Sequence, residues 1–301
     1  MSDSPQPIVI LGTGRSFTSV ISCMIGEHPD MIGLPETNIF LYDTIGELLN
    51  RFGSGAKMRR LAGILRTLAY FHDGEQTDDS VEAAASFLGE HLHWTYRDIA
   101  EHFYKVAGPR GIVEKSISTC RTPENLARVR DAWPNAYFLH ITRHPEAIVN
   151  SMQSRVDSAL EKGKGRNWTR LMKEHSIDGY YNTYTTNVLE FMATLPQGQA
   201  MNLRGEDFLT DARSYTRQIC AWAGLRGDDA AIEAMMHPEN NPFANIGPAG
   251  AEMGMSATFI KNPFYSGEPV AVKPMTFQAE DIGLDVEKRK MALLGNRLGY
   301  A

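Results

Sequence analysis

The sequence predicts an α/β protein with a central parallel sheet of about five strands flanked by helices. Short apolar segments begin near residues 8, 31, 111, 137 and 199, and helical patterns separate most of them. This alternation is typical of parallel sheets, because each parallel connection needs a right-handed crossover that usually carries a helix. The 301 residues are 43% apolar, which is enough for a sizeable core. We expect a single domain over residues 1–301.

The first strand leads into the most informative segment, residues 7–19, with the sequence PIVILGTGRSFTS. Free backbone N–H groups at the start of a helix bind anions, and Gly12 and Gly14 let the backbone approach one closely. The segment therefore predicts an anion site. Capping of the following helix by Ser16 or Thr18 is the alternative explanation for the same residue types.

The residues of this loop favour a phosphate or sulfate that is held without a metal. A nucleotide triphosphatase loop needs G-x-x-x-x-G-K-[ST], but Phe17 stands five positions after Gly12 and no lysine precedes Lys57. The positive charge is Arg15, whose guanidinium can hold two oxygens of a phosphoryl or sulfuryl group. The strand at 137–142 also ends without an aspartate for magnesium. The sequence thus favours a metal-free group transfer over a kinase reaction.

Two charged residues follow the next strands of the predicted sheet. Glu36 comes after the strand candidate at 31–34, and Lys115 ends the candidate at 111–115. Because the carboxyl ends of parallel strands share one edge, where ligands bind in open sheets, we expect both residues near the anion loop. Alternatively, Glu36 caps the following helix or pairs with Arg15, and Lys115 is a solvated lysine at a strand end.

Between these two strands lies an insertion, about residues 40–108, that we expect to be mostly helical. Residues 51–71 have apolar side chains at helical spacing, residues 72–79 form a polar break, and residues 81–106 have a long amphipathic pattern. We expect this insertion to shape part of a substrate pocket.

A further strand and turn predict a second anion site. The strand at 137–142 leads through Arg143 into a helix, and Pro145 suits the first turn of that helix. Arg143 and Ser151 are a little over two helical turns apart, so both can reach one phosphate if the chain before Pro145 bends back. Alternatively, Arg143 pairs with a surface carboxylate and Ser151 faces solvent.

The remaining segments are a helical stretch, a strand and an irregular loop. Residues 167–195 predict one long helix or two, rich in aromatic side chains that line a pocket or pack in the core. An apolar strand follows at 199–203. Residues 238–275 are rich in Pro, Gly and Asn with little periodicity, and we expect them to form a lid over a cofactor or acceptor.

These segments together resemble the sulfotransferases that use 3′-phosphoadenosine 5′-phosphosulfate (PAPS). Residues 12–19 resemble the 5′-phosphosulfate loop of that family, and Arg143 and Ser151 match its 3′-phosphate pair in spacing. Further matches, in the family's order along the chain, are His28-Pro29, Arg204-Gly205-Glu206-Asp207-Phe208, Trp222-Ala223-Gly224-Leu225 and Leu298-Gly299-Tyr300. The chain is more similar to bacterial and Golgi-type members than to the cytosolic phenol and steroid enzymes.

The resemblance implies a P-loop nucleotide-binding-like fold and transfer of a sulfuryl group from PAPS to an acceptor hydroxyl, which leaves 3′-phosphoadenosine 5′-phosphate (PAP). It implies Glu36 as the general base, and Arg15 and Lys115 as cations that stabilise the leaving phosphate. The residues implied to bind the donor are Gly12, Thr13, Gly14, Arg15, Ser16, Phe17, Thr18, Ser19, Arg143 and Ser151. No metal is implied.

Three departures from the family pattern keep other hypotheses open. Phe17 stands where the family's loop usually has glycine, and Ile117 stands where cytosolic members have histidine. The triplet that completes the 3′-phosphate site in cytosolic members is absent, because Arg289-Lys290 run into Met291. We expect the missing contacts to come from residues 241–265. A non-catalytic nucleotide-binding homologue and a P-loop nucleotide kinase are the alternatives.

Composition and charge exclude several other classes of protein. The formal net charge is −6, whereas nucleic-acid binding needs a basic face. We expect no secretory signal and no membrane span, because no apolar stretch is long enough. Three cysteines without a CxxC pair indicate reduced thiols and a cytoplasmic protein. A small molecule, a glycan, a lipid and a carrier-bound acyl chain are all possible acceptors, and the sequence does not indicate the oligomeric state.

Overall fold

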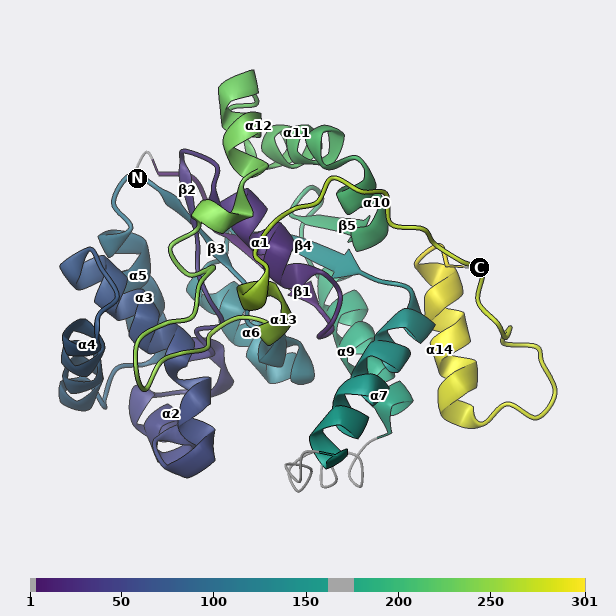
Figure 1. Ribbon diagram of the computed structural model, residues 1–301, viewed down its shortest axis with the longest axis horizontal. Coiled ribbons are helices and arrows are strands. Elements are labelled where there is room, and N and C mark those ends of the chain that lie inside the picture. The colour runs from purple at the N-terminus through teal and green to yellow at the C-terminus, as the bar shows by residue number, and fades with distance from the viewer. Residues whose placement is uncertain (1–3, 162–175, 301) are drawn as a thin grey trace.

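The computed structural model describes residues 4–161 and 176–300, and a five-stranded sheet lies at its centre (Figure 1). Its strands are β1 (Ile8–Gly12), β2 (Met31–Gly33), β3 (Gly111–Glu114), β4 (Tyr137–Thr142) and β5 (Ala200–Arg204). Their order in the sheet is β2-β3-β1-β4-β5, and each neighbouring pair is parallel. The predicted α/β class with about five parallel strands is confirmed.

β1 lies at the centre of the sheet because its side chains are apolar toward both faces. All five of its residues are buried, as expected for a parallel strand that helices cover on both sides. Ile8 pairs with Val113 of β3 and with Tyr137 of β4. The carboxyl ends of β1, β3 and β4 therefore lie at the same edge of the sheet.

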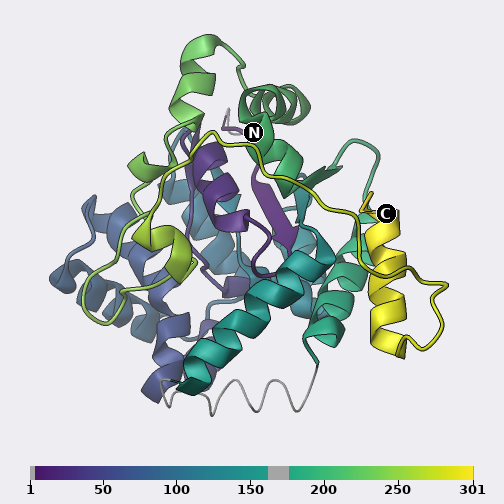
Figure 2. The same cartoon turned by 45° about the vertical axis from the view of Figure 1, so that its right-hand side comes forward.

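Helices cover both faces of the sheet (Figures 1 and 2). Those that share a core with Ile8 and Ile10 of β1 are α1 (Thr18–Gly26), α10 (Gly205–Thr210), α11 (Ala212–Ala223) and α12 (Asp229–Met235). Val9 and Leu11 point to the opposite core, which contains α6 (Pro123–Ala132) and α9 (Ile177–Met192). α7 (Pro145–Glu161) and α14 (Val286–Arg297) pack against α9.

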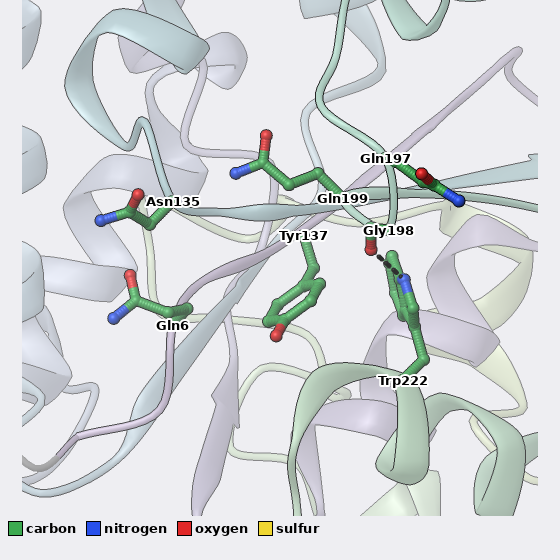
Figure 3. A pocket seen from close by; sticks show the side chains of 7 residues that line it. All are labelled: Gln6, Asn135, Tyr137, Gln197, Gly198, Gln199 and Trp222. Carbon is green, nitrogen blue, oxygen red and sulfur yellow. Dashed lines mark hydrogen bonds between the residues drawn. The ribbon is translucent and has the colours of Figure 1, made fainter.

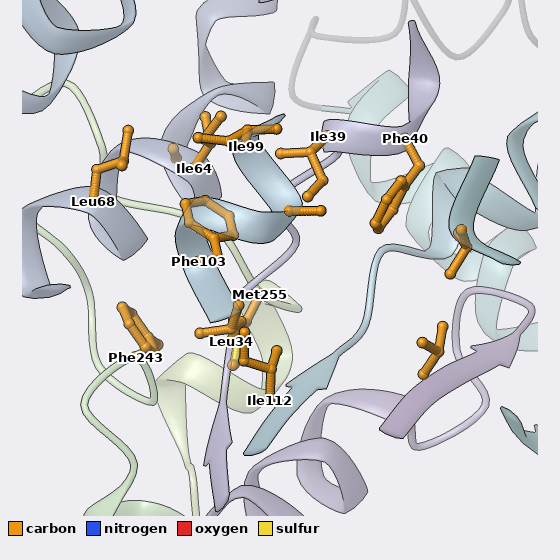
Figure 4. Packing of buried hydrophobic residues seen from close by; sticks show 14 of the residues in the cluster. Leu34, Ile39, Phe40, Ile64, Leu68, Ile99, Phe103, Ile112, Phe243 and Met255 are labelled. Carbon is orange, nitrogen blue, oxygen red and sulfur yellow. The ribbon is translucent and has the colours of Figure 1, made fainter. Parts of the chain in front are cut away.

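The insertion between β2 and β3 is helical, as predicted. Its elements are η1 (Ile39–Leu41), α2 (Ile45–Phe52), η2 (Gly55–Arg60), α3 (Ala62–Asp73), α4 (Asp78–Glu90) and α5 (Tyr96–Val106), where η denotes a 3-10 helix. Their apolar side chains pack on Leu34 and Ile112 at the sheet, and on Phe243 and Met255 from the C-terminal part of the chain (Figure 4). The insertion thus shares the main core with the sheet.

Polar caps divide the long amphipathic pattern at residues 81–106 into α4 and α5. The Thr95 hydroxyl accepts a hydrogen bond from the Asp98 backbone N–H, and the Asp98 carboxylate accepts one from the Thr95 backbone N–H. This reciprocal capping box starts a new helix, although the hydrophobic periodicity continues through it. The pattern at 51–71 likewise contains the end of α2, the turn η2 and most of α3.

The segment that was expected to form a lid has little regular structure. Between α12 and α14, the described chain contains two short helices, η4 (Pro238–Asn240) and α13 (Ala257–Lys261). It passes beside α1 (Figure 2). Another expected helical stretch, residues 167–195, lies partly outside the described residues, and from Ile177 it forms α9. The short helix η3 (Ile117–Arg121) follows β3.

Candidate active site

The loop between β1 and α1 begins with a glycine that packs tightly against β4. A Cβ atom at Gly12, where φ is +155°, would lie 2.6 Å from the Ile141 carbonyl oxygen of β4. Arg15 and Phe17 have φ angles of 74° and 62°, in the left-handed region that residues with a side chain rarely adopt. Such strain is concentrated at functional sites, where the surrounding structure holds it.

The first turn of α1 is available to a ligand. Phe17 occupies the N-cap position, and its side chain makes no capping hydrogen bond. Thr13 Oγ1 and Ser16 Oγ are 2.6 Å apart and hydrogen-bond each other. The N–H groups and dipole of the helix start therefore point toward the space in front of the loop, as an anion site requires.

The structure brings Arg15, Arg143 and Ser151 together at this loop. Arg15 Nε donates to Ser151 Oγ at 3.0 Å, and Arg143 Nη1 donates to the Arg15 carbonyl oxygen at 2.8 Å. The Arg143 guanidinium also lies 4.4 Å from the centroid of the Phe17 ring, within range of a cation–π interaction. The two predicted anion sites are thus adjacent to each other.

These arginines create a local positive field in a chain that is negative overall. Burial lowers the pKa of Arg15, and the nearby charge of Arg155 lowers it further. Burial also lowers the pKa of Arg143; Glu206 opposes this shift, and the charge of Arg15 adds to it. Like charges held this close favour binding of an anion between them.

Glu36 and Lys115 meet at the edge of the same loop. Lys115 Nζ lies 2.8 Å from Glu36 Oε1 and 3.2 Å from Ser19 Oγ. The Lys115 side chain is fully buried, whereas that of Glu36 is 31% exposed. Glu36 therefore pairs with Lys115, rather than with Arg15 as the alternative hypothesis had it, and keeps part of its carboxylate open to a substrate.

The buried carboxyl group of Glu114 holds the segments that carry the ion pair between Glu36 and Lys115. Glu114, at the end of β3, accepts hydrogen bonds from the hydroxyl groups of Thr37 and Ser116 and from the Ser116 backbone N–H. Burial raises the pKa of Glu114 to about 7. Because Thr37 follows Glu36 and Ser116 follows Lys115, these bonds hold both members of the pair in place.

Two tyrosines of α9 face the loop. The Gly14 backbone N–H donates to Tyr180 Oη at 2.9 Å, and the rings of Tyr180 and Tyr184 lie 4.2 Å apart. Burial raises the pKa of both phenols, and the negative charge of Glu36 raises each further. Tyr180 thus occupies a backbone donor of the predicted anion loop, close to the Glu36 carboxylate.

Part of the irregular C-terminal segment closes over Arg15. Arg15 Nη1 donates to Ser256 Oγ at 3.3 Å and to Thr258 Oγ1 at 3.4 Å. The Ser256 backbone N–H donates to Ser19 Oγ at 3.3 Å. Both residues fall within residues 241–265, the segment from which additional phosphate contacts were expected.

No individual role was predicted from the sequence for Tyr180 or Arg155, although Tyr180 lies in the aromatic stretch at 167–195 that was expected to line a pocket or pack in the core. Arg155 follows Ser151 by about one helical turn on α7, so the spacing in the sequence indicates that the two side chains lie on the same face of this helix. No comparable signal existed for Tyr180, because helical periodicity does not show which neighbour a half-buried aromatic residue contacts.

Glu206 and Asp207 hold neighbouring segments together at the ends of β4 and β5. Glu206 accepts hydrogen bonds from the His144 backbone N–H at 2.8 Å and from Tyr300 Oη at 2.9 Å. Asp207 forms an ion pair with Arg204 at 2.6 Å. These contacts fasten the C-terminal Leu298-Gly299-Tyr300 motif to the ends of β4 and β5.

A pocket lies at the opposite edge of the sheet (Figure 3). Its lining includes Gln6 before β1, Tyr137 at the start of β4 and Gln199 before β5. Trp222 closes one side and donates from Nε1 to the Gly198 carbonyl oxygen at 2.6 Å. Since these residues lie at the amino ends of the strands, the pocket is separate from the loop site.

Several structural features bear on the class of site. The described residues contain no cluster of three or more metal-ligating side chains, and none of their helices is long and apolar enough to cross a membrane. Cys23, Cys120 and Cys220 are free and buried. The Gly12 backbone N–H donates to Cys120 Sγ at 3.4 Å, which places one of these thiols directly behind the loop.

The fold and these contacts define an α/β protein with an anion-binding site, lined by positively charged side chains, at the carboxyl edge of its sheet. The model of the sulfotransferase family matches residues 7–229, and the chain belongs to that family. The protein is therefore an enzyme, a sulfotransferase. The predicted resemblance is confirmed.

Two solved structures share the fold over almost the whole chain. The sulfotransferase domain from the curacin biosynthetic pathway has a TM-score of 0.75 at 17% identity, covering 99% of this chain and 98% of its own. The sulfotransferase domain from the Synechococcus PCC 7002 olefin synthase has a TM-score of 0.73 at 18% identity, covering 99% of this chain and 96% of its own. No curated protein sequence matches the chain significantly.

Proposed function

We propose that this sulfotransferase uses PAPS as the sulfuryl donor and a hydroxyl-bearing compound as the acceptor. The observation that carries the proposal is the contact between the two anion sites: Arg15 binds Ser151, and Arg143 binds the Arg15 carbonyl oxygen. A donor with phosphate groups at both its 3′ and 5′ positions would use both sites at once. A ligand with a single phosphate would leave one group of cations uncompensated.

In this proposal the loop and the helix start hold the 5′-phosphosulfate. Arg15 and the backbone N–H groups of residues 12–19 face the sulfuryl end, while Arg143 and Ser151 hold the 3′-phosphate. Ser256 and Thr258, which already contact Arg15, supply further hydroxyl groups near the donor. The residues present fit a metal-free site, because the charge on the donor is met by guanidinium and ammonium groups.

The proposed reaction is an in-line displacement at sulfur. The acceptor oxygen forms a bond to sulfur as the bond between sulfur and the bridging oxygen of the 5′-phosphate breaks, and the acceptor proton passes to a Glu36 carboxylate oxygen. Negative charge builds on the leaving phosphate, where Arg15 and Lys115 stabilise it. Lys115 is well placed for this role, because its ammonium lies between Glu36 and Ser19 of the loop.

We further propose that residues 1–301 form one domain and that the protein is cytoplasmic, as the free, buried cysteines favour. The acceptor hydroxyl belongs to a small molecule, a glycan, a lipid or a carrier-bound acyl chain.

The test is incubation with PAPS carrying radiolabelled sulfate, together with an acceptor panel or a cell extract. We expect label in a product that retains the sulfate as an ester, and release of PAP in equal amount. Tighter binding of ATP with magnesium than of PAP, or no transfer of label from PAPS to any acceptor in the extract, would contradict PAPS as the donor.

A further inference from the structure

The carboxylate of Glu36 borders a surface formed by the helical insertion and α9. Asn38 Nδ2 donates to the carbonyl oxygens of Glu36 at 3.2 Å and of Arg60 at 3.0 Å, so one amide group joins the two segments. The start of α3 is equally close, because a Cβ atom at Gly63 would overlap the Glu36 carbonyl oxygen. The chain around Arg60 therefore lies next to the backbone of Glu36, the residue proposed as the base.

Two arginines and a tyrosine share this surface. Arg60 Nη1 donates to Ser118 Oγ at 3.2 Å, and Ser118 and Arg121 both belong to η3. Burial raises the pKa of Tyr184 to about 12; Cys120 and Glu36 also raise it, whereas Arg121 and Arg60 lower it. Both arginines and Glu36 are thus close enough to act on the same phenol.

Neither arginine forms an ion pair with a carboxylate of the described residues. Among residues 4–161 and 176–300, the ion pairs of Arg97, Arg128, Arg204, Arg213, Arg217 and Arg226 have carboxylate partners, whereas Arg60 and Arg121 have none. Both are exposed, and Lys57 and Arg59 add further exposed positive charge on η2. In a chain with a net charge of −6, this local excess of cations requires an explanation.

We propose that the acceptor is an anion, whose hydroxyl group lies at Glu36 and whose carboxylate or phosphate group pairs with Arg60 and Arg121. The inference rests on the proposed function, because it takes Glu36 as the base. Guanidinium groups bind both kinds of oxyanion through paired hydrogen bonds. Neutral alcohols, simple phenols and cationic sugars would leave these arginines without a partner and are poorer acceptors.

The test compares acceptors that differ only in charge. Enzyme saturated with PAP is titrated calorimetrically with 8-hydroxyoctanoate, 8-hydroxyoctyl phosphate and octane-1,8-diol, and with the corresponding six- and ten-carbon sets. We expect at least one anion to bind at least about tenfold more tightly than its matched diol. Whether the carboxylate or the phosphate binds more tightly then identifies the group. Equal affinities for anion and diol at every length would overturn the proposal.

Variants of the two arginines provide the second readout. Arg60→Met with Arg121→Met keeps the apolar stems and should remove the preference for the anion, while affinity for PAP and for the diol stays unchanged. Arg60→Lys with Arg121→Lys should retain part of it. The matched control, Arg213→Met with Arg217→Met on α11, removes the same charge elsewhere and should retain all of it. A preference that survives in the Arg60 and Arg121 double variant contradicts the proposal.

The two hypotheses fail in different ways. If the wild-type enzyme does not bind PAP, the proposed donor is wrong, and the same titrations on free enzyme still decide whether Arg60 and Arg121 select anions. If PAP binds and sulfate is transferred equally well to diols and anions, the proposed function stands and the anionic acceptor is rejected.

Discussion

At the scale of single residues, the loop after β1 combines backbone strain with a specific side-chain contact. Phe17 has φ +62° and lies beneath the Arg143 guanidinium. A left-handed residue with a side chain costs on the order of 1–3 kcal/mol, and a cation–π contact returns about 0.5–2 kcal/mol. The contact between the Phe17 ring and Arg143 therefore offsets part of the backbone strain at Phe17, and the same contact positions the Arg143 guanidinium.

Two substitutions at Phe17 separate these effects. Phe17→Ala and Phe17→Gly both remove the ring, but only glycine adopts the left-handed conformation without strain. We expect the glycine variant to be more stable than the alanine variant by about 1 kcal/mol in urea unfolding. An alanine variant that equals or exceeds the glycine variant would show that this conformation is not adopted.

Glu36→Gln tests the proposed base. The amide keeps the size of the side chain but cannot accept the acceptor proton, so turnover should fall at least about 100-fold while PAP affinity changes little. Steady-state kinetics and calorimetric titration with PAP measure the two effects. Glu90→Gln, at the exposed end of α4, is the control and should behave as wild type. Undiminished turnover in the Glu36 variant would remove it as base.

Tyr180→Phe tests whether the tyrosine hydroxyl competes with the donor for the Gly14 N–H. Removing the competitor should tighten PAP binding about two- to tenfold, the value of one ordinary hydrogen bond. Tyr181→Phe is the control, because the neighbouring Tyr181 packs on the other side of α9 with Ile148 and Met291. Weaker PAP binding in the Tyr180 variant would mean that the hydroxyl supports the donor instead.

At the scale of elements, the end of β3 and the chain after β2 are joined by the buried carboxyl group of Glu114. Its hydrogen bonds to Thr37 and Ser116 place Glu36 and Lys115 within 2.8 Å of each other. Burial raises the pKa of Glu114 from 4.5 to about 7, so the group keeps its proton in the folded protein under mildly acidic conditions.

This raised pKa predicts a dependence of stability on pH. Between about pH 4.5 and 7 the unfolded chain has lost the Glu114 proton while the folded protein retains it, so a rise in pH favours unfolding. Glu114 should therefore lower the stability of the wild type from pH 5 to pH 8, whereas His102 and His140, whose pKa values burial lowers to about 4, act in the opposite direction up to about pH 6.5. Glu114→Gln should reduce that loss by up to about 3 kcal/mol in urea unfolding, because its side chain does not ionise.

Glu90→Gln is again the control and should keep the pH profile of the wild type. The Glu114 variant should still depend on pH, because burial raises the pKa of Glu27 to about 7 and lowers those of His102 and His140 to about 4. A pH profile identical in wild type and Glu114→Gln would contradict the burial of an ionisable group at this position.

At the scale of the whole molecule, the topology gathers distant residues at one edge. β1 is central, with β3 and β2 on one side and β4 and β5 on the other. The chain runs from β1 to β2, returns to β3 and then crosses to β4 on the other side of β1. Ligand sites in open α/β sheets lie at such a reversal of strand order. Residues as far apart as Arg15 and Thr258 therefore meet at the carboxyl ends of the strands.

Much of this arrangement was predictable from sequence. The strand at 137–142 was predicted with its observed bounds, because an apolar run ends sharply at polar residues there. Glu36 and Lys115 were expected at the same edge because each follows a strand of the parallel sheet. The contact between Arg15 and Ser151 was not expected, since the sequence does not show how closely the ends of β1 and β4 approach.

The most direct measurement for the central claim is a crystal structure of the protein with PAP. The account predicts the 5′-phosphate on the backbone N–H groups of residues 12–19 beside Arg15. It also predicts the 3′-phosphate of the same molecule within hydrogen-bond distance of Arg143 and Ser151. PAP bound elsewhere, or bound with its 3′-phosphate away from both residues, would contradict the account.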